Sequence, residues 1–208
     1  AYNPATDVYD GIVLKRSRAW VRDAIRTQRI PAIDGIYRKQ DLDGFMGLVP
    51  AEESDLNTAI FITHLHLDHM AGIGFVAPQI PIYMHKNAIQ IERALEATGE
   101  GVETLERDYT PFDENQPIRV GEIEVLPILT SRRSYRDFAF LITRPDGTIH
   151  WTGDLYLHGY EAQLTFDQME FLKQRGVDVR LCDTWAFMDE ILLQINVKTD
   201  PAAIKASR

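Results

Sequence analysis

Four residues that commonly bind metals lie within six positions of this sequence. His64, His66, Asp68 and His69 occupy the stretch 64–69, which holds three of the chain's six histidines. Imidazole nitrogens and carboxylate oxygens suit zinc, manganese and similar divalent ions. A single histidine next to a strand is usually structural, and Asp68 by itself would fit a helix N-cap. Four such residues together, directly after an apolar segment, indicate a metal centre instead.

The segment before this stretch would position the first two histidines. Residues 58–63 are rich in β-branched and aromatic side chains, which predicts a buried strand. In an extended chain, residues two apart point the same way, so His64 and His66 share one face. Leu65 and Leu67 then take the opposite face, where we expect them to anchor the segment in a core.

Composition indicates an ordinary globular protein. The 208 residues are 45% hydrophobic and 25% charged, which favours one domain with a sizeable core. A lone Cys182 excludes an internal disulfide framework. No apolar run approaches the roughly 20 residues that span a bilayer, and no signal-peptide pattern begins the chain, so we expect a cytoplasmic location. The net charge of −9 means that binding of nucleic acid would need local basic patches.

The rest of the chain alternates between helical and strand-like patterns. Apolar periodicity predicts helices over residues 14–28 and 86–98, the second ended by Gly99. A third helix is expected to begin at Thr165, with Gln168 completing a capping box. Strands are expected over residues 79–84, 118–120, 123–126, 138–142 and 177–182. This order predicts an α/β protein with helices layered on sheets.

The HxHxDH pattern of residues 64–69, followed by Met-Ala-Gly, resembles the signature of the metallo-β-lactamase-fold hydrolases. A second match is the segment 151–154, Trp-Thr-Gly-Asp, where that family has an aspartate that bridges two metals. The resemblance implies an α/β fold of the metallo-β-lactamase type, an αββα sandwich. It assigns this domain to residues 1–190 and leaves residues 191–208 as a tail or the remnant of a following segment.

The continuation of the sequence is similar to one branch of this family, the β-CASP nucleases that include ribonuclease J. Residues 152–159 read Thr-Gly-Asp-Leu-Tyr-Leu-His-Gly, and a helix and a strand ending in Cys-Asp-Thr at 182–184 follow. Residues 29–37 also look like the lead-in to that branch. The resemblance covers most of residues 25–185.

The chain departs from the family pattern in two ways. Thr130 stands where the family supplies a third histidine to the first metal, and no histidine follows His158. A threonine hydroxyl is a poor ligand beside imidazole. The family also has strands and a glycine-rich turn ahead of anything visible here, and the β-CASP branch inserts a domain after the position of Asp183. Relative to the family, the fold would be short at both ends, and two interpretations stay open: a pared-down relative, or a chain that is part of a longer one.

On this resemblance, His64 and His66 would hold one metal, Asp68 and His69 would hold a second, and Asp154 would lie between them. One ion held by a mixture of these residues, with waters at open positions, is equally consistent. We expect one or two Zn²⁺ ions, with Mn²⁺ as the alternative.

Three functions fit these residues, and a metal-dependent phosphodiesterase or ribonuclease comes first. Hydroxide generated at the metals would attack phosphorus, with Asp68 orienting it and His158 contacting a phosphate or donating a proton. Two arginine groups would either hold phosphates or form solvated surfaces. They are Arg18, Arg22, Arg26 and Arg29, and Arg132, Arg133 and Arg136.

The other two functions need no nucleic acid. The second is a metal-dependent hydrolase of a small ester, lactone or thioester, which the acidic net charge favours. The third is a degenerate, non-catalytic relative that lacks the third histidine ligand. Expected partners are accordingly RNA or a small phosphodiester or ester, without a membrane, and self-association is left open.

Overall fold

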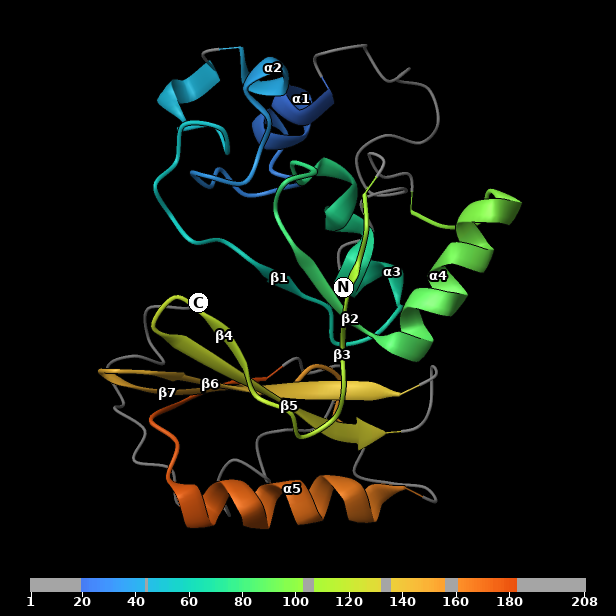
Figure 1. Ribbon diagram of the computed structural model, residues 1–208, viewed down its shortest axis with the longest axis vertical. Helices are drawn as coiled ribbons and strands as arrows, with labels where there is room; N and C mark the ends of the chain where they lie inside the picture. Colours follow the sequence, from blue (N-terminus) through green and yellow to red (C-terminus); the bar gives the residue numbers. More distant parts are fainter. Residues whose placement is uncertain (1–19, 44, 103–106, 132–135, 156–160, 183–208) are drawn as a thin grey trace. The chain divides into compact units, whose positions relative to one another are not determined.

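The structure is a computed structural model of the chain, and it describes residues 20–43, 45–102, 107–131, 136–155 and 161–182. The chain divides into two compact units, Ala1–Phe112 and Asp113–Arg208. The first unit combines several helices with a three-stranded sheet, and the described part of the second combines one helix with a five-stranded sheet (Figure 1). The predicted α/β fold class is therefore confirmed.

The sheet of the first unit has three parallel strands in the order β1-β2-β3. The strands are β1 (Ile60–Phe61), β2 (Ile82–His85) and β3 (Thr110–Phe112). Parallel neighbours need a crossover connection, and α4 (Lys86–Thr98) forms the one between β2 and β3. This helix has the bounds that the sequence predicts.

The predicted strand over residues 58–63 is much shorter in the structure. Only Ile60 and Phe61 pair as strand residues, although Ile62 still donates its amide to the Tyr83 carbonyl at 2.9 Å. Beyond that bond the chain leaves the sheet to enter a helix. The metal-binding stretch is therefore a connection between strand and helix.

Short helices make up most of the remaining first unit. Those near the amino end are α1 (Trp20–Arg26), α2 (Lys39–Leu42) and the 3₁₀ helix η1 (Phe45–Gly47). Those between β1 and β2 are α3 (Leu67–Met70) and the 3₁₀ helix η2 (Ala71–Phe75). Buried side chains from α1, α2 and η2 pack with two residues of the connecting segments in one cluster, which comprises Val21, Ala24, Ile25, Ile30, Tyr37, Leu42 and Phe75. The predicted helix over residues 14–28 is thus confirmed for its described part, although it ends two residues early.

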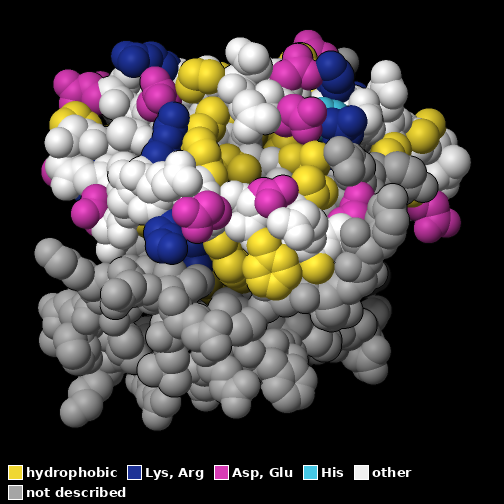
Figure 2. All heavy atoms as spheres, turned by 90° about the horizontal axis from the view of Figure 1, so that it is seen from below, with side chains coloured by type: hydrophobic (Ala, Val, Ile, Leu, Met, Phe, Trp, Pro, Cys, Tyr) yellow, Lys and Arg dark blue, Asp and Glu magenta, His cyan; other side chains and the backbone are white. Residues whose placement is uncertain are grey.

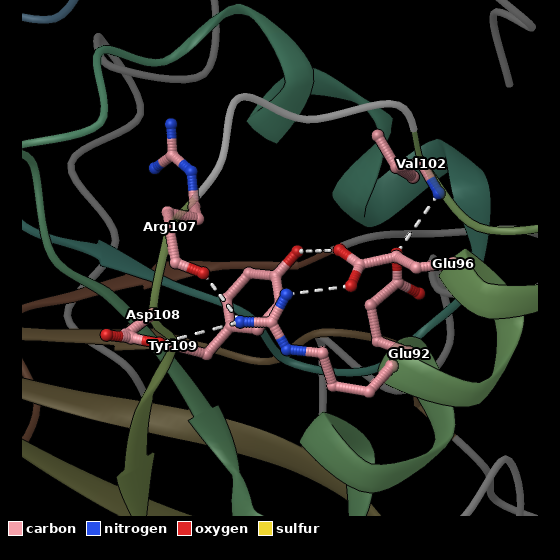
Figure 3. Close-up of polar contacts among 7 residues, drawn as sticks. Glu92, Glu96, Val102, Arg107, Asp108 and Tyr109 are labelled. Carbon is pink, nitrogen blue, oxygen red and sulfur yellow. Dashed lines mark hydrogen bonds and ion pairs between the residues drawn. The ribbon is translucent and has the colours of Figure 1, made fainter.

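Polar contacts fix α4 to the segment that leads into β3 (Figure 3). The Tyr109 hydroxyl donates to Glu96 Oε1 at 2.9 Å, and Arg93 donates to the other oxygen of Glu96 at 2.8 Å. Glu92, only 1% exposed, accepts a hydrogen bond from the Val102 amide at 3.1 Å. The connection is therefore tied down by hydrogen bonds on one side of the helix.

The sheet of the second unit has five strands in the order β4-β5-β6-β7-β8. Neighbours from β4 to β7 are antiparallel, and β8 runs parallel to β7. The strands are β4 (Ile118–Val120), β5 (Ile123–Ser131), β6 (Asp137–Arg144), β7 (Gly147–Trp151) and β8 (Val179–Leu181). The helix α5 (Ala162–Arg175) joins β7 to β8 and packs on the sheet through Leu172, against Ile128 and Leu141.

The predicted start of α5 is wrong. The helix begins at Ala162 after the N-cap residue Glu161, so Thr165 and Gln168 lie inside it. Both are buried, and Gln168 lies 3.3 Å from Nε2 of His150 on β7. The spacing that resembles a capping box instead places polar side chains against the sheet.

The described surface is mixed in charge. Figure 2 shows acidic and basic side chains interspersed with hydrophobic ones on the face that it views. Among the described helices, none has both the length and the apolar character needed to cross a bilayer.

Candidate metal centre

The histidine stretch is held between two apolar anchors. Leu65 and Met70, the latter 2% exposed, both pack in the cluster beneath β1 and β2. His66 has the extended backbone of an N-cap residue, and its carbonyl accepts the amides of His69 and Met70 at 3.0 and 3.1 Å. This arrangement turns the chain into α3 directly after His66, which brings His69 back toward His64.

The three histidine rings gather in one place. The Nε2 atom of His64 lies 2.9 Å from Nδ1 of His66, and the ring centroids of His64 and His69 are 4.1 Å apart. The ligand nitrogens of His64 and His69 lie within 4.8 Å of each other. His64 is 1% exposed, so this cluster has a buried side.

Thr63, which the sequence analysis did not assign to the site, sets the orientation of His64. Its hydroxyl oxygen is 3.0 Å from His64 Nδ1, and both residues are buried. If the hydroxyl accepts the Nδ1 proton, the Nε2 lone pair faces His66. A neighbour that fixes the tautomer of a histidine is the usual outer-shell partner of a metal ligand. The only signal for it in the sequence is its position directly before the first histidine.

The donor set fits a divalent metal of the zinc type. A tetrahedral zinc ion with nitrogen ligands at about 2.05 Å holds two such nitrogens about 3.3 Å apart. The pair at 2.9 Å therefore needs to open by only a few tenths of an ångström. To bind the ion through Nδ1, His66 would carry its ring proton on Nε2, because a metal ligand needs a free lone pair.

The acidic member of the motif lies beside the third histidine. Asp68 lies in the first turn of α3, and its Oδ2 atom is 3.6 Å from His69 Nε2. Its side chain is 35% exposed, whereas that of His69 is 9% exposed. Leu67, expected to anchor the segment, is 60% exposed instead, because the two-residue alternation ends where α3 begins.

The predicted bridging aspartate belongs to the second unit. Asp154 follows β7 in a turn whose Gly153 has a φ of +56°. The turn is anchored by the Thr152 amide, which donates to the Leu181 carbonyl of β8 at 3.0 Å. The bridging role of Asp154 stays a prediction. His158 and Asp183 lie outside the described residues.

Thr130, at the position where a third histidine was expected, has a structural role in β5. It is fully buried, and its hydroxyl donates to the Asp137 carbonyl at 3.1 Å. This bond spans the two strands at a bulge between Leu129 and Ser131. The Thr130 hydroxyl therefore has a structural partner within its own unit.

A family model described as the beta-lactamase superfamily domain matches residues 39–200, most of the chain. The chain belongs to this superfamily. The matched range contains all five predicted ligands, and it confirms the metallo-β-lactamase resemblance at the level of the superfamily. The β-CASP branch stays a prediction.

Several solved structures are similar to the chain. A protein of unknown function from Enterococcus faecalis V583 aligns with a TM-score of 0.70 and 25% identity, over 97% of this chain and 48% of that one. The chain therefore spans about half the length of that protein. The metallo-β-lactamase-fold protein YhfI from Bacillus subtilis aligns with a TM-score of 0.47 and 24% identity, over 72% of this chain and 58% of that one.

A zinc-bound PqqB from Methylobacterium extorquens is a further match, with a TM-score of 0.42 and 16% identity, over 68% of this chain and 47% of that one. Among curated proteins, none matches the chain significantly.

Proposed function

We propose that this chain is a metal-dependent hydrolase with its centre at residues 64–69. The observation that carries the proposal is the approach of His64 Nε2 to His66 Nδ1 at 2.9 Å, with the His69 ring beside them. The superfamily to which the chain belongs is usually hydrolytic and metal-dependent. Three imidazoles and a carboxylate match the ligands that catalytic zinc uses.

Each predicted residue has a role in this proposal. His64 and His66 would bind one zinc ion, Asp68 and His69 would contribute to a second, and Asp154 would lie between the two. A bound ion would lower the pKa of a coordinated water toward neutrality and so supply hydroxide. The Asp68 carboxylate would accept a hydrogen bond from the attacking water and orient it. His158 would donate a proton to the leaving group.

The described arginines favour a small substrate over a nucleic acid. Arg22 lies 3.4 Å from Asp43, Arg26 stacks on the Phe45 ring at 4.7 Å, and Arg136 pairs with Glu114 at 3.1 Å. These partners compete with phosphate for the guanidinium groups. With a net charge of −9, the chain also has little long-range attraction for RNA. We therefore place a small ester, lactone or thioester first among the substrates.

A phosphodiesterase or ribonuclease is the second candidate. It is supported by the β-CASP resemblance of residues 152–159 and 182–184. The same hydroxide would attack phosphorus instead of a carbonyl carbon.

The test compares hydrolysis of p-nitrophenyl acetate, bis(p-nitrophenyl) phosphate and single-stranded RNA by zinc-loaded and manganese-loaded protein. We expect the protein to hydrolyse the ester. Asp154→Ala should lower the rate by more than about 100-fold, because losing a bridging ligand should cost more than losing an outer-shell partner, which costs about 10- to 100-fold. The matched control is Asp146→Ala, which removes an exposed aspartate paired with Arg144 and should leave the rate unchanged. Full activity of Asp154→Ala would refute the bridging role, and cleavage of RNA alone would favour the second candidate.

A further inference from the structure

The first unit contains an apolar pocket that shares a wall with the candidate metal centre. Its volume is about 220 Å³, and His69 is among its lining residues. The apolar walls come from the segment after α1, from β1 and from the helices α3 and η2. Side chains from these elements include Ile30, Ile33, Ile36, Phe61, Met70 and Ile73.

The described side chains of the pocket offer a ligand few hydrogen bonds. Among the described residues that line it, only Tyr37 and His69 have polar side chains. The Tyr37 hydroxyl donates to the Pro31 carbonyl, and Tyr37 is 3% exposed. Burial also raises the pKa of Tyr37 to about 12, so the phenol stays neutral. Among the described lining residues, His69 is therefore the one ionisable group that also belongs to the candidate metal centre.

We propose that this pocket binds the apolar acyl or aryl group of the substrate, with the bond to be hydrolysed next to His69. The inference rests on the proposed hydrolase function and narrows its substrate class to esters, lactones or thioesters of hydrophobic acids. A charged sugar–phosphate chain would lose its hydration in such a lining without replacement hydrogen bonds.

The volume sets the size of the group. An engineered protein cavity of about 150 Å³ with apolar walls holds one benzene molecule, which has six carbons. At the same volume per carbon, 220 Å³ accommodates about nine carbons. The pocket thus fits a phenyl ring with a short substituent, or a medium-length alkyl chain.

The first experiment measures binding without any turnover. Butyrate, hexanoate, octanoate and dodecanoate are titrated calorimetrically into metal-free and zinc-loaded protein. Each added methylene should lower Kd about fourfold, the equivalent of about 0.8 kcal/mol per buried CH₂, until the pocket is full at about nine carbons. The proposal would be overturned if, in both the metal-free and the zinc-loaded protein, Kd did not depend on the chain length of the alkanoate.

Two variants then locate the binding site. Ile33→Trp adds bulk at the pocket wall, at a residue that is 41% exposed and so tolerates the change. Val49→Trp is the matched control, because Val49 is also β-branched and 39% exposed but does not line the pocket. We expect Ile33→Trp to weaken hexanoate binding more than tenfold and Val49→Trp to leave it unchanged. Equal binding by both variants would place the ligand elsewhere and overturn the proposal.

The two proposals fail in different ways. Chain-length dependence in the metal-free protein reports on the pocket alone, whereas metal content and ester hydrolysis report on the centre. If zinc binds and esters are cleaved without any preference for longer acyl chains, the pocket assignment is wrong and the hydrolase stands. If alkanoates bind as expected but no metal binds, the substrate assignment falls with the hydrolase.

Discussion

At the scale of single residues, Thr63 is the most informative neighbour of the metal-binding motif. Its hydroxyl lies 3.0 Å from His64 Nδ1, in a position where both side chains are shielded from water. If the hydroxyl accepts the Nδ1 proton, this hydrogen bond fixes one ring tautomer and leaves the Nε2 lone pair of His64 facing His66. The motif alone identifies the residue types that would bind a metal. The contact with Thr63 would hold the first of these residues, His64, in the orientation that binding needs.

Replacing Thr63 by valine should weaken zinc binding while the fold is retained. Valine has nearly the same shape but cannot accept the Nδ1 proton, so we expect zinc affinity to fall about 10- to 100-fold. Competition with a chromogenic chelator measures it. Thr98→Val is the control, because the Thr98 hydroxyl only donates to carbonyls of its own helix at 3.0 and 3.3 Å. Equal affinity of the two variants would show that Thr63 does not orient the ligand.

His150 should make stability depend on pH. It is 1% exposed, and burial, with a smaller contribution from Arg180, lowers its pKa from 6.5 to about 3. The unfolded chain therefore takes up a proton near pH 6.5 that the folded chain takes up only near pH 3. It follows that the free energy of unfolding falls as the pH drops through this window, by up to about 1.4 kcal/mol per unit.

Denaturant unfolding of His150→Gln at pH 4, 5, 6 and 8 checks this expectation. The variant should show a shallower loss of stability between pH 6 and 4 than the unsubstituted chain. The value at pH 8 is the reference, since His150 is neutral in both states there. Parallel curves for the two proteins would contradict the assignment.

At the scale of elements, the sequence predicted helices with clear end signals better than short connections. The bounds of α4 follow from its apolar periodicity and from Gly99, which has a φ of +78°. By contrast, the start of α5 was predicted wrongly. Thr165 and Gln168 have the spacing of a capping box, but both are buried inside the helix. The turn of the chain into α3 was missed because β-branched residues predict a longer strand, and packing of Met70 decides the outcome instead.

The helix end at Gly99 allows a direct test. Gly99→Ala should destabilise the fold by about 1 kcal/mol, because a left-handed residue with a Cβ is strained. Gly72→Ala is the control, since Gly72 has no positive φ and a Cβ there meets nothing within 4 Å. Thermal unfolding compares the two. A larger loss for Gly72→Ala would contradict this explanation of the helix end.

The strand β5 accounts for the unusual residue at position 130. Introducing the family's histidine with Thr130→His should not raise zinc stoichiometry. It should cost about 1–3 kcal/mol, because a larger side chain overpacks a fully buried position. Thr143→His on the neighbouring strand β6 is the control, because Thr143 is exposed and should tolerate the change. A gain of bound zinc in Thr130→His would contradict this expectation.

At the scale of the whole molecule, the sequence predicted the superfamily and the ligand types but not how the chain divides. The HxHxDH pattern was enough to predict the superfamily, because four residues of metal-binding type within six positions are hard to explain by a structural role. The division between Phe112 and Asp113 was not predicted, although a polar stretch that ends in proline, residues 113–117, follows β3 there. The sequence also did not predict the apolar pocket beside His69, because its walls come from segments that are separated along the chain.

The binding of metal by the intact chain is the central claim, and metal content per chain tests it most directly. The protein would be purified without chelator, incubated with zinc or manganese, desalted and analysed by mass spectrometry of the elements. We expect at least one zinc ion per chain. It should be lost in His64→Ala and retained in His85→Ala, because the His85 imidazole accepts the Asn87 amide at the start of α4. A chain that folds but holds no metal, or one that retains it in His64→Ala, would contradict the account.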